Sequence, residues 1–254
     1  MQVNLLSPLP DGKFSGDCKE KIMKIAIISA MRKELDLVLA QMEKHGGYEE
    51  KEFGLFIGYT GEIGGHEVVA LQCGIGKVNS ALRTLRLIDA YSPDLVINSG
   101  VAGGVDESLH IGDVLVAESV AYHDVWCGPG TEPGAADGFP VRMESDAKAV
   151  ACLRDISGAE KEAYKFGLIA SGDIFVSKPE EVVEIKGKLP EACGCDMESG
   201  SIAQTCMMCG VPFVVVRVLS DMPGGGENIS EYQNFWSEAP ERTFEAVMKL
   251  IKSL

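Results

Sequence analysis

Residues 212–221 read Pro-Phe-Val-Val-Val-Arg-Val-Leu-Ser-Asp, and Met222-Pro-Gly-Gly-Gly226 follows directly. A continuous apolar run of this length is typical of a fully buried strand. In open α/β sheets, ligands bind outside the carboxyl ends of the strands, so Asp221 is placed to meet a ligand. An apolar setting raises the pKa of such an acid and lets it carry a proton. The alternative, and the commoner role for such a residue, is a helix N-cap or turn aspartate.

The chain around this strand alternates between strand and helix patterns. Strands are predicted at 24–29, 55–61, 66–72, 94–98, 113–123, 166–171, 193–196 and 212–221. Helices are predicted at 32–45, 77–91, 145–156, 199–210 and 230–254, the last with a break before Pro240, and a capping box at Ser177–Glu180 opens a further helix that runs to about Gly187. Gly64-Gly65 joins two strands as a hairpin, so the sheet cannot be wholly parallel. We therefore expect an α/β fold: a three-layer sandwich around a central mixed, twisted sheet.

Composition narrows the class of protein. The 254 residues are 46% hydrophobic and carry a formal net charge of −15, which argues against partners such as nucleic acid or an anionic membrane surface. No apolar stretch reaches the ~18 residues of a membrane span. Residues 1–22 lack the apolar core of a secretory signal and are expected to be a poorly ordered extension, because Met23 directly precedes the first strand. Residues 23–254 are expected to form a single domain.

The cysteines raise the question of a metal. Cys206-Met-Met-Cys209 has the spacing of a zinc knuckle, and Cys193 and Cys195 stand nearby. Cys206 and Cys209 fall on an apolar helical stretch, however, and the four histidines are distant in sequence. We interpret them as reduced, buried core thiols, which suit a cytoplasmic protein, and expect no metal site.

Three carboxylates follow predicted strands. Glu34 and Glu198 stand in places comparable to that of Asp221, although each taken alone is typical of the first turn of a helix. A parallel sheet would gather all three at one edge, where they suit acid and base roles on a polar organic ligand. Gly74-Ile-Gly-Lys-Val78 does not fit the P-loop pattern, so nucleoside triphosphates are not indicated. Glycines in Ser99–Gly104 permit either close approach of a ligand or a tight turn.

A set of short motifs, in this order along the chain, resembles the 5′-methylthioadenosine/S-adenosylhomocysteine nucleosidases of the nucleoside phosphorylase/hydrolase superfamily. The motifs are Met23–Glu34, Cys73–Val78, Asn98–Gly104, Tyr122–Asp124, Ser171–Phe175, Asp196–Glu198 and Val214–Asp221. The resemblance implies hydrolysis of the bond between adenine and ribose in 5′-thio-substituted adenosines. It also implies a homodimer whose subunits share the active site, and a reaction that needs no cofactor.

The resemblance also implies roles for individual residues. Asp221 matches the acid that protonates the departing adenine, Glu34 the residue that activates water, and Glu198 the carboxylate that binds the ribose hydroxyls. Met197 matches the residue packed under the ribose, and Phe175 the aromatic that stacks on adenine. Further substrate-binding positions are implied at Val176, whose backbone bonds adenine, and at Ile75, Arg217, Val101 and Ala102. Such roles suit a glycosidic cleavage, which builds positive charge on the sugar and negative charge on the base.

Alternatives stay open at this point. Val101 stands where some members of the family have serine, so water positioning is expected to rest more on Glu34 and Arg217. Phosphorylases of the superfamily carry a Gly-Asp-Pro-x-Arg phosphate loop where this chain has Ser29-Ala-Met-Arg-Lys-Glu34, although Arg32 and Lys33 are positive there. A futalosine-type nucleoside hydrolase and a non-catalytic nucleoside-binding protein are further possibilities. The loop around Trp126 and the preferred 5′ substituent are not assigned by the sequence.

Overall fold

A parallel four-stranded unit forms the centre of the sheet. The computed structural model describes residues 22–254 except 55, 160–162, 225–226 and 239–240. Within it β4 (His66–Gln72), β1 (Lys24–Ser29), β5 (Leu95–Gly104) and β10 (Phe213–Asp221) pair side by side in parallel. All nine residues of β10 are buried, as expected for a strand covered on both faces.

The sheet curls on one side until it closes on itself. From β10 the pairing continues to β6, β8 and β9, and β9 returns to the end of β5. The bounds of these strands are Val114–Tyr122 for β6, Lys165–Ser171 for β8 and Ala192–Asp196 for β9. On the other side, β3 (Ile57–Ile63) and β2 (Glu49–Glu52) extend the sheet antiparallel to β4. The mixed sheet that the hairpin predicted is thereby confirmed.

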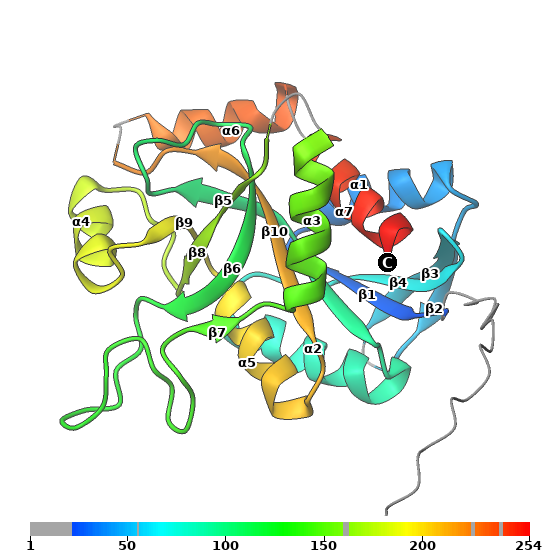
Figure 1. The fold of residues 1–254 in the computed structure, drawn as a ribbon, viewed down its shortest axis with the longest axis horizontal. Coiled ribbons are helices and arrows are strands. Elements are labelled where there is room, and N and C mark those ends of the chain that lie inside the picture. The colour runs from blue at the N-terminus through cyan, green and yellow to red at the C-terminus, as the bar shows by residue number, and fades with distance from the viewer. Residues whose placement is uncertain (1–21, 55, 160–162, 225–226, 239–240) are drawn as a thin grey trace, which may run out of the picture.

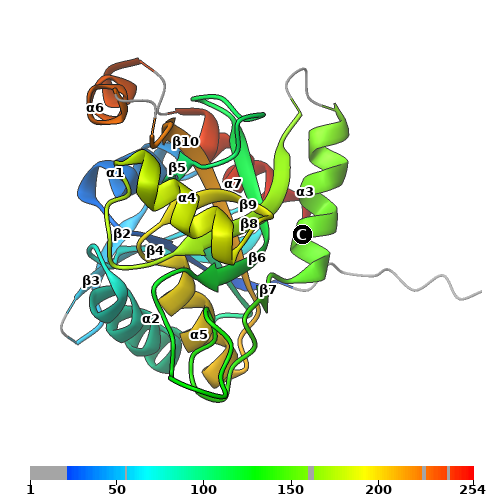
Figure 2. The ribbon, with the colours of Figure 1, turned by 90° about the vertical axis from the view of Figure 1, so that its left-hand side faces the viewer.

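Helices cover both faces of this sheet (Figure 1). On one face lie α1 (Arg32–Lys44), α3 (Ala147–Ala159) and α7 (Glu241–Ser253), and on the other α2 (Lys77–Tyr91) and α5 (Ser199–Cys209). Figure 2 shows the same separation from the side, with α4 (Pro179–Lys188) beside β8 and β9. α6 (Asn228–Glu238) packs against β10. One apolar cluster lies on each face, so the expected three-layer arrangement is confirmed.

Some local predictions were wrong. β5 does not stop at Asn98 but continues through Ser99–Gly104, because β10 and β9 supply pairing partners along its whole length. The short strands β2 and β7 (Met143–Glu144) were missed. The carboxylate that caps α4 belongs to Glu181, not Glu180: it accepts hydrogen bonds from the backbone N–H groups of residues 177 and 178. Cys206 is buried as expected, whereas Cys209 is exposed.

Some predictions fall where the structure says nothing. The predicted extension, apart from Ile22, lies outside the described residues, as do Leu55 at the start of a predicted strand and the break before Pro240. In the part of the chain that is described, no helix combines the length and apolar character needed to cross a membrane.

Candidate active site

One pocket gathers residues from strand ends that are far apart in sequence. It encloses about 600 Å³ between protein atoms, a volume that includes open solvent at its mouth. All three predicted carboxylates line it, and so do six of the other predicted site residues. These six are Ile75, Val101, Ala102, Phe175, Val176 and Met197. The seventh, Arg217, does not line the pocket.

The three carboxylates do not reach the pocket in the same way. Glu34 follows β1 and Asp221 ends β10, and these two strands run parallel on either side of β5. Glu198 follows β9, which is antiparallel to the end of β5 and so runs back toward the middle of that strand. The expectation that a parallel sheet gathers all three therefore holds for two acids, and the third arrives through closure of the sheet.

Glu34 is held rigidly at the start of α1. Its side chain is 2% exposed. Oε2 accepts a hydrogen bond of 2.8 Å from the backbone of Met31, and Oε1 accepts one of 3.0 Å from the backbone of Val101. Burial raises the pKa of Glu34, while the charge of Arg217 and the backbone hydrogen bonds act in the opposite direction. Glu34 is thus a first-turn acid and also a pocket acid.

Glu198 stands directly before α5 and reaches across to another helix. Its Oε1 accepts a hydrogen bond of 2.8 Å from the backbone of Gly76, at the start of α2. Burial raises the pKa of Glu198 to about 8, and the negative charge of Asp196 adds to this effect. Both effects favour the protonated form of this carboxyl.

Asp221 ends the Val-rich strand at a register shift. β10 pairs regularly with β5 up to Leu219, and after an irregularity Asp221 pairs with Gly103. Bulges of this kind re-aim side chains next to active sites. Asp221 Oδ1 accepts a hydrogen bond of 2.6 Å from Ser220 Oγ, and burial raises the pKa of Asp221 against the effect of that bond. The alternative role as a helix cap is not borne out, because α6 begins only at Asn228.

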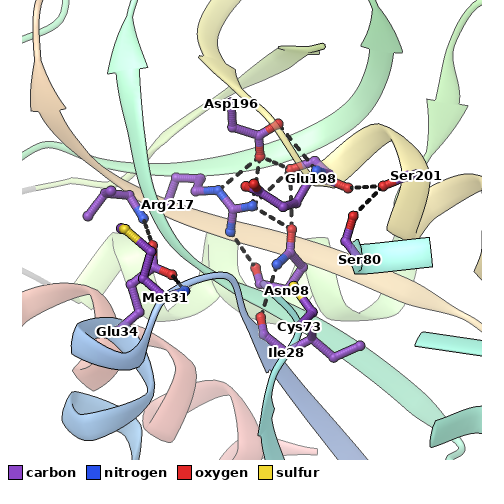
Figure 3. A network of polar contacts seen from close by, with 12 residues as sticks. Ile28, Met31, Glu34, Cys73, Ser80, Asn98, Asp196, Glu198, Ser201 and Arg217 are labelled. Carbon is purple, nitrogen blue, oxygen red and sulfur yellow. Dashed lines mark hydrogen bonds and ion pairs between the residues drawn. The ribbon is translucent and has the colours of Figure 1, made fainter. Parts of the chain in front are cut away.

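Arg217 lies behind the pocket in a buried ion pair (Figure 3). Its Nε and Nη2 donate to Asp196 Oδ2 over 3.1 and 2.7 Å. Nη1 and Nη2 also donate to the backbone and side-chain oxygens of Asn98, and Nη2 to Ser199 Oγ. Both members of the pair are 2% exposed at their side chains. Since its hydrogen bonds go to these groups, Arg217 affects the pocket by holding Asp196 in place and by lowering the pKa values of Glu34 and Glu198 through its charge.

Sequence reasoning missed several pocket residues. Asp196 lines the pocket, and a signal for it existed: an arginine inside an apolar strand needs a buried carboxylate partner. Met31 and Tyr232 also line the pocket. Tyr232 comes from α6 and meets the Phe175 ring edge-on, with centroids 5.7 Å apart. No local sequence pattern predicts that Tyr232 lines the pocket, because its position depends on how α6 packs.

The two basic residues that favoured a phosphate site lie elsewhere. Arg32 donates to Asp36 and to the hydroxyl of Tyr59, and its side chain is 57% exposed. Lys33 lies over the Trp236 ring at 5.4 Å. Neither lines the pocket. Among the described residues no group of three or more metal-ligating side chains is placed to hold an ion.

Comparison with known proteins places this geometry in a family. The Phosphorylase superfamily model matches residues 24–252. A 5′-methylthioadenosine/S-adenosylhomocysteine nucleosidase from Geobacillus sp. (strain WCH70) is 37% identical over 234 residues, which cover 91% of this chain and 99% of that protein. The solved structure of an S-adenosylhomocysteine nucleosidase from Streptococcus pyogenes, in complex with 5-methylthiotubericidin, has a TM-score of 0.87 at 35% identity, covering 92% of this chain and 98% of that one.

A native structure of futalosine hydrolase from Helicobacter pylori is also similar, with a TM-score of 0.86 at 28% identity, covering 92% of this chain and 99% of that one. The identity to the nucleosidases is higher and extends over nearly their whole length. The chain belongs to the Phosphorylase superfamily and, within it, to the family of 5′-methylthioadenosine/S-adenosylhomocysteine nucleosidases.

Proposed function

We propose that this protein hydrolyses the N-glycosidic bond of 5′-methylthioadenosine and S-adenosylhomocysteine, releasing adenine and the 5′-thioribose product. The observation that carries the proposal is the convergence of Asp221, Glu34 and Glu198 on one pocket. The names of the relatives support the same substrates.

Each acid has a distinct role in this proposal. Asp221 donates a proton to the imidazole ring of adenine as the bond breaks, and its raised pKa favours the protonated form that this step needs. Glu34, fixed by two backbone N–H groups, accepts a proton from the attacking water. Glu198 accepts hydrogen bonds from the ribose hydroxyls, and once ionised it also stabilises positive charge on the sugar.

Apolar groups hold the substrate between these acids. Phe175 stacks on adenine while the backbone of Val176 bonds its edge, and Met197 packs under the ribose. Ile75, Val101 and Ala102 complete the walls near the ribose and the water. Arg217 is a positioning residue here: it holds Asp196, and its charge moderates the pKa values of Glu34 and Glu198.

Water is the nucleophile in this proposal. The place where a phosphorylase would bind phosphate holds the Glu34 carboxylate, which repels an anion. Arg32 and Lys33, the cations that would favour phosphate, point to other partners. Phosphate-independent release of adenine is therefore expected.

A homodimer with a shared active site is part of the proposal. Val78, Leu82 and Leu85 form an exposed apolar stripe on α2, with side chains 79%, 51% and 40% exposed, and exposed Ile75 leads from it into the pocket. Such a contiguous patch marks an interaction site, and a second copy would cover it. Leu82→Glu is expected to give a monomer in light scattering with a raised KM. A Leu82→Glu dimer with unchanged KM would contradict this arrangement.

Unpaired cysteines in the described part of the chain favour a reducing compartment, and we propose the cytoplasm.

The decisive experiment measures release of the free nucleobase from 5′-methylthioadenosine, S-adenosylhomocysteine and futalosine, with and without phosphate. Release that depends on phosphate would identify a phosphorylase, and activity on futalosine alone would identify the alternative hydrolase. Binding without release from any substrate would identify a nucleoside-binding protein.

Asp221→Asn and Glu34→Gln test the two catalytic roles. We expect each to lower kcat by about 10²–10⁴-fold while nucleoside affinity stays within threefold, because each removes a proton-transfer group and keeps the side-chain shape. Unchanged turnover in either variant would remove that residue from the mechanism.

A further inference from the structure

An ion pair outside the pocket joins the start of α2 to the loop after β6, and a hydrogen bond extends this link to the loop after β8. Lys77 Nζ lies 2.6 Å from Asp124 Oδ1, and their side chains are 22% and 18% exposed. Lys77 is the first residue of α2, where a positive charge is unfavourable to the helix dipole. The Lys77 ammonium lies 4.9 Å from the centroid of the Tyr122 ring. The charge of Lys77 therefore does not stabilise α2, and its contacts with Asp124 and Tyr122 point to a different role.

Asp173 links the other two members of this group. Its Oδ1 accepts a hydrogen bond of 2.8 Å from the backbone of Lys77, so it caps α2 from a distant loop. Its own backbone N–H donates to Asp124 Oδ2 over 2.9 Å. Asp124 therefore accepts from both partners, one at each oxygen. These bonds lower the pKa of Asp124 even though burial acts to raise it.

The contact between the loops is too tight for a side chain at position 172. A Cβ on Gly172 would lie 2.8 Å from Asp124 Cγ and would also collide with the ring of His123. The loop at 172–174 thus rests directly on residues 123 and 124. Its position is fixed by contact as well as by hydrogen bonds.

Two of the linked segments carry pocket groups. The loop before α2 carries Ile75 and Gly76, whose N–H holds the Glu198 carboxylate. The loop after β8 carries Phe175 and Val176, two and three residues beyond Asp173. Asp124, Lys77 and Asp173 themselves do not line the pocket.

We propose that Asp124, Lys77 and Asp173 are positioning residues, which set the distance between the loop that stacks on adenine and the loop that holds the ribose carboxylate. The inference rests on the proposed nucleosidase activity. It assigns these residues to substrate binding and not to proton transfer, because none of their hydrogen bonds goes to Asp221 or Glu34. Their loss is therefore expected to act on KM and leave kcat nearly unchanged.

The test measures two quantities on Asp124→Ala: steady-state kinetics with 5′-methylthioadenosine, and the Kd of adenine by calorimetry. We expect KM and the adenine Kd each to rise about tenfold while kcat stays within about threefold. Asp124→Asn keeps one acceptor oxygen and is expected to restore part of the affinity. Lys77→Met removes the charge and keeps a side chain of similar length, so we expect the same rise in KM and Kd without the loss of side-chain volume that Asp124→Ala brings.

Asp106→Ala is the matched control. Like Asp124, Asp106 forms an ion pair with a lysine, Lys186, and accepts a hydrogen bond from a backbone N–H, that of Ser108. Its loop, residues 105–113, contains none of the residues that line the pocket. Its KM and adenine Kd are expected to stay at wild-type values. Folded Asp124→Ala and Lys77→Met variants with wild-type KM and Kd would overturn the proposal, as would a fall in kcat without a change in Kd. A wild-type protein that releases no adenine would instead refute the proposed function.

Discussion

Gly100→Ala probes the geometry around Glu34 with a single added methyl group. Position 100 lies in the middle of β5, where it pairs with Arg217 of β10, so its backbone has little freedom to move. A Cβ there would lie 3.0 Å from Glu34 Cδ and closer still to Oε1. Carbon atoms in ordinary contact are about 3.5–4.0 Å apart, so the carboxyl group must retreat by about 0.5 Å or more.

That retreat breaks the hydrogen bond between Glu34 Oε1 and the backbone of Val101. Loss of one hydrogen bond to a charged group costs about 1.5–3 kcal/mol. At about 2–4 °C per kcal/mol, the melting temperature falls by about 3–12 °C. A displacement of about 1 Å at a reacting group costs about 100-fold in rate. We expect kcat to fall by about that factor, and the Kd of adenine to stay within about twofold because Phe175 and Val176 lie on another loop.

The assay combines adenine release from 5′-methylthioadenosine, calorimetric binding of adenine and thermal unfolding. Gly187→Ala in α4 is the control, because a Cβ there meets nothing within 4 Å and stability should rise by about 0.4–1 kcal/mol with activity unchanged. A Gly100→Ala protein that keeps kcat within twofold of wild type would refute the role given to the fixed Glu34 carboxylate.

Two further predictions concern the charges behind and within the pocket. Arg217→Met leaves the buried Asp196 carboxylate without its cation, which costs about 3–5 kcal/mol, and adding Asp196→Asn is expected to recover part of it in chemical denaturation. The pKa of Glu198 is about 8 in the folded state and near 4.5 in the unfolded state. Between these pH values only the folded state keeps the proton, so the free energy of unfolding falls as pH rises. Glu198→Gln should therefore gain stability over the wild type between about pH 4.5 and 8, and wild-type kcat/KM should rise over the upper part of this range, because ribose binding needs the ionised form. A wild-type melting temperature that rises relative to the variant over this range would contradict the second prediction.

Local patterns in the sequence were sufficient for the layers of the fold. The run at 212–221 predicted a buried strand ending in an acid, and β10 is such a strand. Gly64-Gly65 predicted the hairpin that makes the sheet mixed. Both predictions depend on residues adjacent in sequence, where periodicity and turn chemistry act directly.

Closure of the sheet depends on contacts that no local pattern contains. The glycines at 99–104 were compatible with a turn, and only the pairing of β5 with both β10 and β9 makes them strand. That pairing decides where Glu198 lies, because β9 approaches β5 from the opposite direction to β1. The partner of Arg217 could not be identified from a local pattern either. The strand indicates that Arg217 needs a buried carboxylate, but only the folded structure shows that Asp196, 21 residues away, supplies it.

The same buried pair bears on the pKa values of two pocket acids, Glu34 and Glu198. Arg217 donates to Asp196, Asn98 and Ser199 and to neither of these two acids. Its charge still lowers the pKa of Glu34 and of Glu198, but Asp196 raises that of Glu198, and burial outweighs the rest. An arginine bonded directly to Glu198 would keep that carboxyl ionised at all working pH values. By taking up the guanidinium, and through its own negative charge, Asp196 lets the pKa of Glu198 stay raised. The pKa of Asp221, the acid for the leaving group, is raised instead by burial at the end of β10.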